Sequence, residues 1–369
     1  MQNIDRIPRV AITHGDTNGI GYELILKTFS EPEILELMTP VVYGSRMIAA
    51  VHAEQMQSEC KFNVVSAASE MQENRLNLID VSGESAPVKF GVHTAESSAM
   101  ASKSLAKAVS DVAEGTVDVL VLSPAADDEL HAVMDMVKEM PGVQVAELNP
   151  ISIIGNDTLC IASVSGNVDA GSAVSMASVD SIVERATTFR NTLRRDMRID
   201  NPRIAILSMG EDVDKTEGSN DMTVVAPAVL KLREEGVTAF GPYSAKEMFD
   251  GGKYVNFDGV LGMYDKQVTA PFMDIFGQRC MRMVGGLPII MTSAIQDPSF
   301  DIAGKGVADE TSMRLALYTA IDAFRSRHYY DLPLRNPLGK LYHERREDGD
   351  KARFAVKREF KPREEKTEK

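Results

Sequence analysis

Short runs of apolar residues alternate along the chain with longer stretches in which apolar residues recur every three or four positions. The short runs predict β-strands and the longer periodic stretches predict helices. We expect strands at residues 9–13, 40–43, 76–80, 117–122, 151–154, 159–164, 203–207, 257–263 and 287–291. We expect helices at residues 22–29, from residue 45 onward, and at residues 95–114, 174–194, 224–235 and 310–327. This alternation indicates a layered α/β fold with a mainly parallel sheet.

The end of the chain departs from this pattern. The chain has 369 residues, which suggests two domains at roughly 150 residues each. In residues 344–369, 18 of 26 residues are charged, and both signs are present. Such a segment buries too little apolar surface to offset the entropy lost on ordering. We therefore expect a disordered tail there.

The overall charge limits the kinds of partner. There are 40 Lys and Arg residues against 54 Asp and Glu, a formal net charge of -14. Binding to nucleic acid or an anionic membrane needs a basic face, so we expect neither partner. No apolar run approaches the roughly 18 residues that span a bilayer, and we expect no signal peptide before the first strand. Three cysteines without a CxxC pair cannot build a disulfide framework. These features predict a cytoplasmic protein.

A glycine-rich turn follows the first predicted strand. Residues 10–23 read VAITHGDTNGIGYE, and later segments include NPRIAIL at 201–207, AFGPY at 239–243, MY at 263–264, GLPII at 286–290 and DIAGKG at 301–306. In this order, over residues 7–330, the segments resemble the 4-hydroxythreonine-4-phosphate dehydrogenase (PdxA) family of pyridoxal phosphate biosynthesis.

The resemblance implies a fold and a chemistry. The fold would be the two-domain α/β/α type of isocitrate and isopropylmalate dehydrogenases. Residues 1–126 with 296–343 would form one domain, and residues 127–295 would form the other and carry the interface of a homodimer. The implied chemistry is NAD-dependent oxidation and decarboxylation of a phosphorylated hydroxy amino acid. In the family, a divalent metal held by three histidines polarises the substrate.

The three metal-ligand positions are replaced in this chain. The family's Pro-Gly-His segment reads Pro141, Gly142 and Val143 here. The second position, after the strand at 203–207, is Asp212, and the third, after Met263 and Tyr264, is Asp265. NAD remains the implied cofactor, whereas the replacements argue against the family's metal. Carboxylates suit Mg²⁺ or Mn²⁺, so a repurposed hard-metal site and simple drift to polar residues are the two interpretations left open.

The family's substrate contacts are replaced as well. The positions of its basic and amide side chains are Asp127, Met273, Arg282 and Met291 here, and Lys266 stands where the family has an aspartate. Arg282 with Arg279 and Lys266 is a candidate anion site, with ordinary surface charge as the alternative. Methionines 273, 281, 283 and 291 indicate either a remodelled apolar pocket or core packing.

Other candidates lie near the implied cleft. His14 is either a cleft residue or a turn histidine bonded to backbone, and Asp16 and Asp297 are further candidate cleft residues. His93 lies in a GVHTAE segment that is similar to the family's His-Thr-Glu segment. The family's segment follows the strand that corresponds to 117–122, whereas His93 precedes this predicted strand. We interpret His93 as a surface residue next to a helix cap.

The losses lead to a functional hypothesis. The glycines and packing segments are kept, while the metal and substrate residues are not. We therefore expect a degenerate family member without the family activity. The alternatives are a dehydrogenase altered toward another hydroxy acid, and a non-catalytic dimer that binds or senses a small metabolite.

Overall fold

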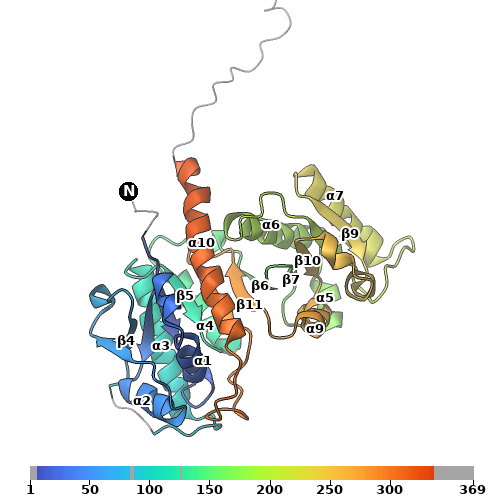
Figure 1. The fold of residues 1–369 in the computed structure, drawn as a ribbon. Helices are drawn as coiled ribbons and strands as arrows, with labels where there is room; N and C mark the ends of the chain where they lie inside the picture. Colours follow the sequence, from blue (N-terminus) through green and yellow to red (C-terminus); the bar gives the residue numbers. More distant parts are fainter. Residues whose placement is uncertain (1–5, 84–86, 125–126, 336–369) are drawn as a thin grey trace, which may run out of the picture. The chain divides into compact units, whose positions relative to one another are not determined.

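The computed structural model describes residues 6–83, 87–124 and 127–335, and those up to His328 form one compact unit (Figure 1). Within the described residues, twelve strands form one sheet in the order β3-β4-β2-β1-β5-β12-β11-β6-β7-β10-β8-β9. Most neighbouring strands run parallel, and helices pack on both faces. The expected α/β class with a mainly parallel sheet is confirmed. The predicted domain limits stay a prediction, and the predicted disordered tail, 344–369, lies outside the described residues.

Half of the sheet comes from the beginning of the chain together with one late strand. Its strands are β1 (Arg9–Thr13), β2 (Thr39–Gly44), β3 (Phe62–Val65), β4 (Leu76–Asp80), β5 (Val119–Leu122) and β12 (Met291–Ala294), and they pair in parallel. Its helices are α1 (Gly21–Thr28), α2 (Arg46–Gln55), α3 (Ala95–Ala113), α4 (Asp127–Lys138) and α10 (Thr311–Arg335).

Alternation along β1 explains why helices cover both faces of this half. Val10 and Ile12 pack with apolar residues of α1 and α10, while Ala11 packs on the other side with Leu105 and Ala108 of α3. Successive side chains of a strand point to opposite faces. Each face therefore needs its own layer of helices.

The other half comes from the middle of the chain. Its strands are β6 (Ile151–Gly155), β7 (Cys160–Ser163), β8 (Ile204–Leu207), β9 (Ala239–Tyr243), β10 (Gly259–Gly262) and β11 (Met281–Gly285). Its helices are α5 (Ala170–Met176), α6 (Val179–Arg195), α7 (Ala226–Glu234), α8 (Ala245–Phe249) and α9 (Asp265–Phe276). Strand β11 is antiparallel to both β6 and β12, and so links the two halves.

Two sequence expectations are wrong in detail. The helix expected at 174–194 is two helices, because Ser178 caps α6 by accepting a hydrogen bond from the backbone of Ser181. The strand expected at 287–291 does not form. Gly286 has a φ of 74°, and Pro288 has no N–H for a ladder. The sheet resumes at Met291, which pairs with Leu120 of β5.

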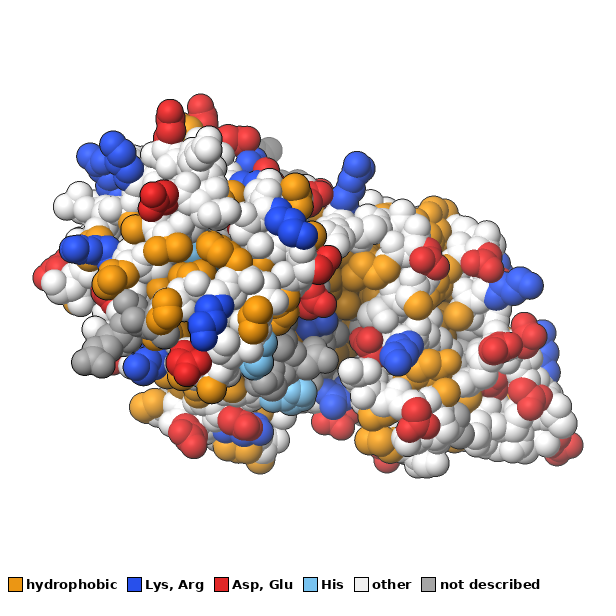
Figure 2. Space-filling model, turned by 90° about the horizontal axis from the view of Figure 1, so that it is seen from below, with side chains coloured by type: hydrophobic (Ala, Val, Ile, Leu, Met, Phe, Trp, Pro, Cys, Tyr) orange, Lys and Arg blue, Asp and Glu red, His pale blue; other side chains and the backbone are white. Residues whose placement is uncertain are grey.

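Two features of the structure concern the nucleic-acid and membrane partners considered above: the distribution of surface charge and the character of the helices. On the face drawn in Figure 2, basic and acidic side chains are interspersed, and no continuous basic surface is visible. In the part of the chain that the structure describes, no helix combines the length and apolar character needed to cross a bilayer.

Candidate functional site

A cavity of about 480 Å³ lies between α4, α6, β6 and β11, beside the end of β7 and the start of α9. We call it the Arg282 cavity. Arg282 lies in the middle of β11, opposite Ile154 of β6. Its neighbours Met281 and Met283 are buried in the core, while Arg282 is half-buried and lines the cavity with Val284. The alternation of β11 therefore directs one guanidinium into the cavity from a central strand.

A second guanidinium lines the same cavity. Arg185 of α6 donates hydrogen bonds through Nη1 to Oδ1 of Asn149 at 2.9 Å and to the carbonyl of Pro150 at 2.6 Å. These two bonds fix the head of the side chain at the edge of β6. These two hydrogen bonds use two of the five guanidinium N–H groups of Arg185. The remaining N–H groups are donors for a ligand.

The cavity also holds a carboxylate and hydroxyl groups. Asp265 begins α9, its backbone N–H donates to the carbonyl of Gly166 at 2.9 Å, and Oγ1 of Thr269 lies 3.2 Å from its Oδ2. Ser163, the last residue of β7, and Ser165 also line the cavity, and the Ser165 hydroxyl donates to the carbonyl of Met263 at 2.6 Å. Among the described lining residues, the guanidinium groups of Arg185 and Arg282 stand with one carboxylate, Asp265, and this composition favours an anion as the ligand.

Within one chain, the three positions implied for the metal do not meet. Asp265 lines the Arg282 cavity, whereas Val143 lines another cavity of about 420 Å³ beside Arg327, and Asp212 is exposed on the loop after β8. Among the described residues there is no group of three His, Cys, Asp or Glu able to hold a metal ion. The residues present do not fit the three-ligand metal site of the family.

The other replaced substrate positions contribute little to the cavity. Met291 is buried in the core, and Met273 packs beside Phe272 and Phe276, so the methionines serve packing. Lys266 is exposed on α9. Asp297 is exposed, and its Oδ1 accepts hydrogen bonds from the N–H and hydroxyl of Ser299. Asp127 begins α4, and its side chain is not described.

His14 is a structural residue of the glycine-rich turn. It is fully buried, its Nδ1–H donates to the carbonyl of Gly15 at 2.7 Å, and its ring stacks on Tyr22 at 4.9 Å. Burial lowers the pKa of His14 to about 4. A Cβ at Gly21 would lie 1.9 Å from the carbonyl oxygen of His14. The turn is therefore packed against itself and is no open phosphate-binding loop.

Asp16, in the same turn, has a partner that sequence reasoning missed. Its Oδ2 accepts a hydrogen bond from Nδ1 of His93 at 2.7 Å and from the hydroxyl of Ser97 at 2.8 Å. His93 is exposed and precedes the N-cap residue Thr94, as expected. Its pairing with Asp16 spans 77 residues of sequence, and no local pattern indicates it.

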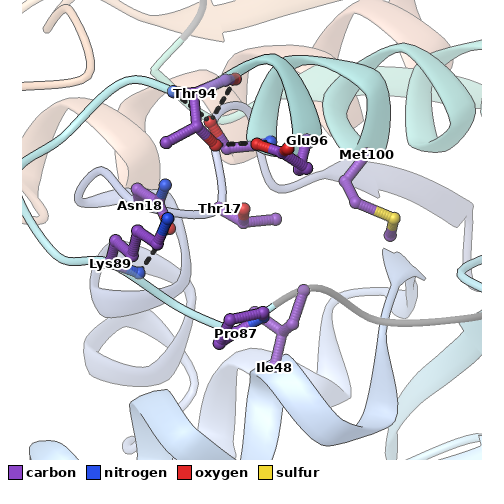
Figure 3. Close-up of a pocket in the computed structure, with 9 residues that line it drawn as sticks. Thr17, Asn18, Ile48, Pro87, Lys89, Thr94, Glu96 and Met100 are labelled. Carbon is purple, nitrogen blue, oxygen red and sulfur yellow. Dashed lines mark hydrogen bonds between the residues drawn. The ribbon is translucent and has the colours of Figure 1, made fainter.

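A small cavity lies near the start of α3 (Figure 3). It measures about 120 Å³ and is lined by Thr17, Asn18, Lys89, Glu96 and other residues. The backbone N–H of Lys89 donates to Oδ1 of Asn18 at 2.9 Å. The space suits a few water molecules more than a metabolite.

Comparison with known proteins identifies the family. The family model described as "Pyridoxal phosphate biosynthetic protein PdxA" matches residues 36–320. A 4-hydroxythreonine-4-phosphate dehydrogenase from Bacteroides thetaiotaomicron is 34% identical over an alignment of 355 residues, and the match covers 94% of this chain and 97% of that protein. The chain belongs to the PdxA family. A D-threonate 4-phosphate dehydrogenase from Cupriavidus necator is 28% identical over 85% of this chain and 96% of its own length.

Solved structures agree on the fold of this PdxA family member. A protein from Salmonella typhimurium titled as a putative 4-hydroxythreonine-4-phosphate dehydrogenase matches with a TM-score of 0.71 at 21% identity, covering 86% of this chain and 100% of that one. The Klebsiella pneumoniae 4-hydroxythreonine-4-phosphate dehydrogenase matches with a TM-score of 0.70 at 22% identity, covering 86% and 99%. The expected isocitrate/isopropylmalate dehydrogenase-like fold class is confirmed.

Proposed function

We propose that this PdxA family protein binds a small phosphate- or carboxylate-bearing metabolite in the Arg282 cavity, and does not catalyse the metal-dependent dehydrogenation of 4-hydroxythreonine 4-phosphate. The observation that carries the proposal is the lining of that cavity. Arg185 and Arg282 stand there with Asp265, and the described chain gathers no metal-binding triad. The protein would therefore keep the arginines that recognise an anion, but it would lack the metal ion that polarises the substrate in the family reaction.

The names of two relatives support an anionic ligand. The Bacteroides thetaiotaomicron and Cupriavidus necator proteins are named for substrates that carry a phosphate. A charge-assisted hydrogen bond is worth roughly 1.5–3 kcal/mol. Two such bonds from Arg185 and Arg282 would supply roughly 3–6 kcal/mol, which is enough for recognition of a small metabolite when the cavity encloses it.

The loss of the metal site supports a loss of turnover. A bound divalent ion would polarise the substrate hydroxyl and the developing ketone. Val143 has no ligand atom, and within one chain the exposed Asp212 lies outside the cavity that Asp265 lines. Asp265 alone offers one carboxylate, which is too few protein ligands for a catalytic zinc site.

The first test is a comparison of turnover. The purified chain and the Bacteroides thetaiotaomicron relative are each mixed with NAD, 4-hydroxythreonine 4-phosphate and Mg²⁺, Mn²⁺ or Zn²⁺, and NADH absorbance is followed. We expect NADH from the relative and none above background from this chain. NADH formation at similar rates would overturn the non-catalytic part of the proposal. If this chain forms NADH only when another hydroxy acid replaces 4-hydroxythreonine 4-phosphate in the assay, the result would favour an altered dehydrogenase.

The second test measures binding directly. Calorimetric titrations use 4-hydroxythreonine 4-phosphate, D-threonate 4-phosphate and NAD, each alone. We expect one of the two phosphorylated acids to bind, with at least tenfold weaker affinity in Arg282→Met. The matched control is Arg279→Met, at an exposed position outside the cavity lining. Absence of binding by both acids, or equal loss in the control, would refute the anion site.

A further inference from the structure

A second cavity, of about 440 Å³, lies on the other side of α4 from the Arg282 cavity. Glu129, Ala132 and Met136 line it from α4, whereas Leu130, His131 and Met134 line the Arg282 cavity. Its opposite wall is α3. We call it the His93 cavity, because His93 and Asp16 both line it.

Asp16 holds the imidazole of His93 in one orientation. The Asp16 side chain is 5% exposed, and its Oδ1 accepts a hydrogen bond from the N–H of Asn18 at 2.8 Å. Its Oδ2 accepts from Ser97 at 2.8 Å and from Nδ1 of His93 at 2.7 Å. A buried carboxylate with these three donors is fixed in place, and it holds the proton of His93 on Nδ1.

In the neutral imidazole of His93, the other ring nitrogen carries a lone pair. The His93 side chain is 63% exposed and its ring lies edge-on to Phe300, with centroids 6.0 Å apart. With Nδ1 donating to Asp16, Nε2 of the neutral imidazole is an acceptor that solvent or a ligand can reach. The arrangement resembles the carboxylate–histidine pairs that orient an imidazole for a ligand.

The lining of the His93 cavity sets the chemical class of that ligand. The acidic groups are Asp16 and Glu129, and no lysine or arginine is among the described residues that line it. Leu105, Met136 and Phe300 supply apolar surface. An ammonium group would meet an imidazole acceptor and an aromatic ring close to the negative charges of Asp16 and Glu129, whereas those charges would repel a carboxylate or phosphate.

We propose that the His93 cavity is a binding site for a small organic amine, whose ammonium group donates a hydrogen bond to Nε2 of His93 and whose apolar part packs against Leu105, Met136 and Phe300. This site is separate from the Arg282 cavity and of opposite charge preference. Binding of an amine in the His93 cavity does not require the anion proposed for the Arg282 cavity.

The test uses three probes that share one apolar chain. Hexylamine, hexanol and hexanoate are titrated at pH 8 while methyl and backbone NMR signals are followed. At this pH an alkylamine, with a pKa near that of lysine at about 10.4, stays protonated. We expect hexylamine to shift signals of α3 and α4 and to bind at least tenfold more tightly than hexanoate. Equal or tighter binding of hexanoate, or no shift with any probe, would overturn the proposal.

Two variants test whether His93 and Glu129 take part in hexylamine binding. His93→Ala and Glu129→Gln should each weaken hexylamine binding at least fivefold, while Glu139→Gln, an exposed charge change just after α4, should leave it unchanged. His93 is exposed, so its loss leaves the core intact. Long-range nitrogen–proton NMR of the His93 ring gives an independent readout. We expect the proton on Nδ1, with perturbation of the Nε2 signal by hexylamine. A proton on Nε2, or binding that survives His93→Ala, would refute the site.

Discussion

Arg327 of α10 and Asp196, the residue that follows α6, form a buried two-point ion pair. Nε of Arg327 donates to Oδ1 of Asp196 at 2.6 Å, and Nη2 donates to Oδ2 at 2.9 Å. The two side chains are 9% and 2% exposed. Nη1 of Arg327 also donates to the carbonyl of Pro288 at 3.1 Å. The pair therefore connects the closing helix with α6 and with the irregular segment between β11 and β12.

Removal of one partner of this pair should destabilise the protein strongly. Leaving a single buried charge costs about 3–5 kcal/mol. We expect Asp196→Asn and Arg327→Met each to lower the free energy of unfolding by an amount of this order, measured by urea denaturation. Arg325→Met is the control, because Arg325 is exposed and lies 4.0 Å from Asp322. A loss below 1 kcal/mol in both buried variants would contradict the expectation.

Acidification should destabilise the folded state through two buried histidines. Burial lowers the pKa values of His14 and His52 to about 4, from 6.5. The unfolded chain therefore binds more protons than the folded chain between these pH values, and stability falls as pH falls from about 6.5 to 4. Each group contributes roughly 3 kcal/mol over that window.

The measurement is the free energy of unfolding as a function of pH. We expect the slope between pH 6.5 and 4 to shrink in His52→Gln, although that variant is less stable at neutral pH, since Nε2–H of His52 donates to the carbonyl of Thr17. His131→Gln, at an exposed position, serves as the comparison. An unchanged slope in His52→Gln would argue against this source of acid sensitivity.

Two glycines should respond differently to alanine. A Cβ at Gly21 would lie 1.9 Å from the carbonyl oxygen of His14, whereas a Cβ at Gly210 has its nearest neighbour at 3.7 Å. Overpacking against backbone costs about 1–3 kcal/mol or more. We expect Gly21→Ala to lower the melting temperature by several degrees and Gly210→Ala to change it little. Similar shifts in both would contradict the packing of the turn.

Zinc should bind weakly to the positions that the family resemblance implies for a metal. Asp265 is the only one of Val143, Asp212 and Asp265 that lines the Arg282 cavity. We expect calorimetry to detect no micromolar Zn²⁺ binding that Asp265→Asn removes. Detection of such binding would show a working site and refute the loss of the metal. Binding of Mg²⁺ alone, lost in Asp212→Asn and Asp265→Asn, would support the repurposed hard-metal site.

We expect the protein to be a homodimer. The family resemblance places the active site at a two-fold interface, and a closed isologous contact would be kept even where chemistry is lost. Light scattering should give about twice the chain mass of 40.3 kDa. A constant mass near that of one chain across a wide concentration range would refute it.

Local patterns in the sequence determined the elements and the family. Apolar runs such as 9–13, 40–43 and 76–80 are strands within a residue of their expected limits, because strand and helix periods depend on neighbours along the chain. The ordered motifs are enough to indicate the family without the fold. Local patterns failed at 287–291, where Gly286 and Pro288 interrupt an apolar run, and at β3, β9 and β11, which were not expected.

Only the tertiary structure decided which side chains share a site. Arg282 and Asp265 were separate replaced positions in the sequence, and sheet order with helix packing puts them in one cavity with Arg185. The same packing separates Val143 from Asp265 and joins His93 to Asp16 across 77 residues. The periodicity of a segment specifies which face of an element a side chain lies on. Which faces meet depends on strand order and on helix packing, and contacts between distant segments determine both.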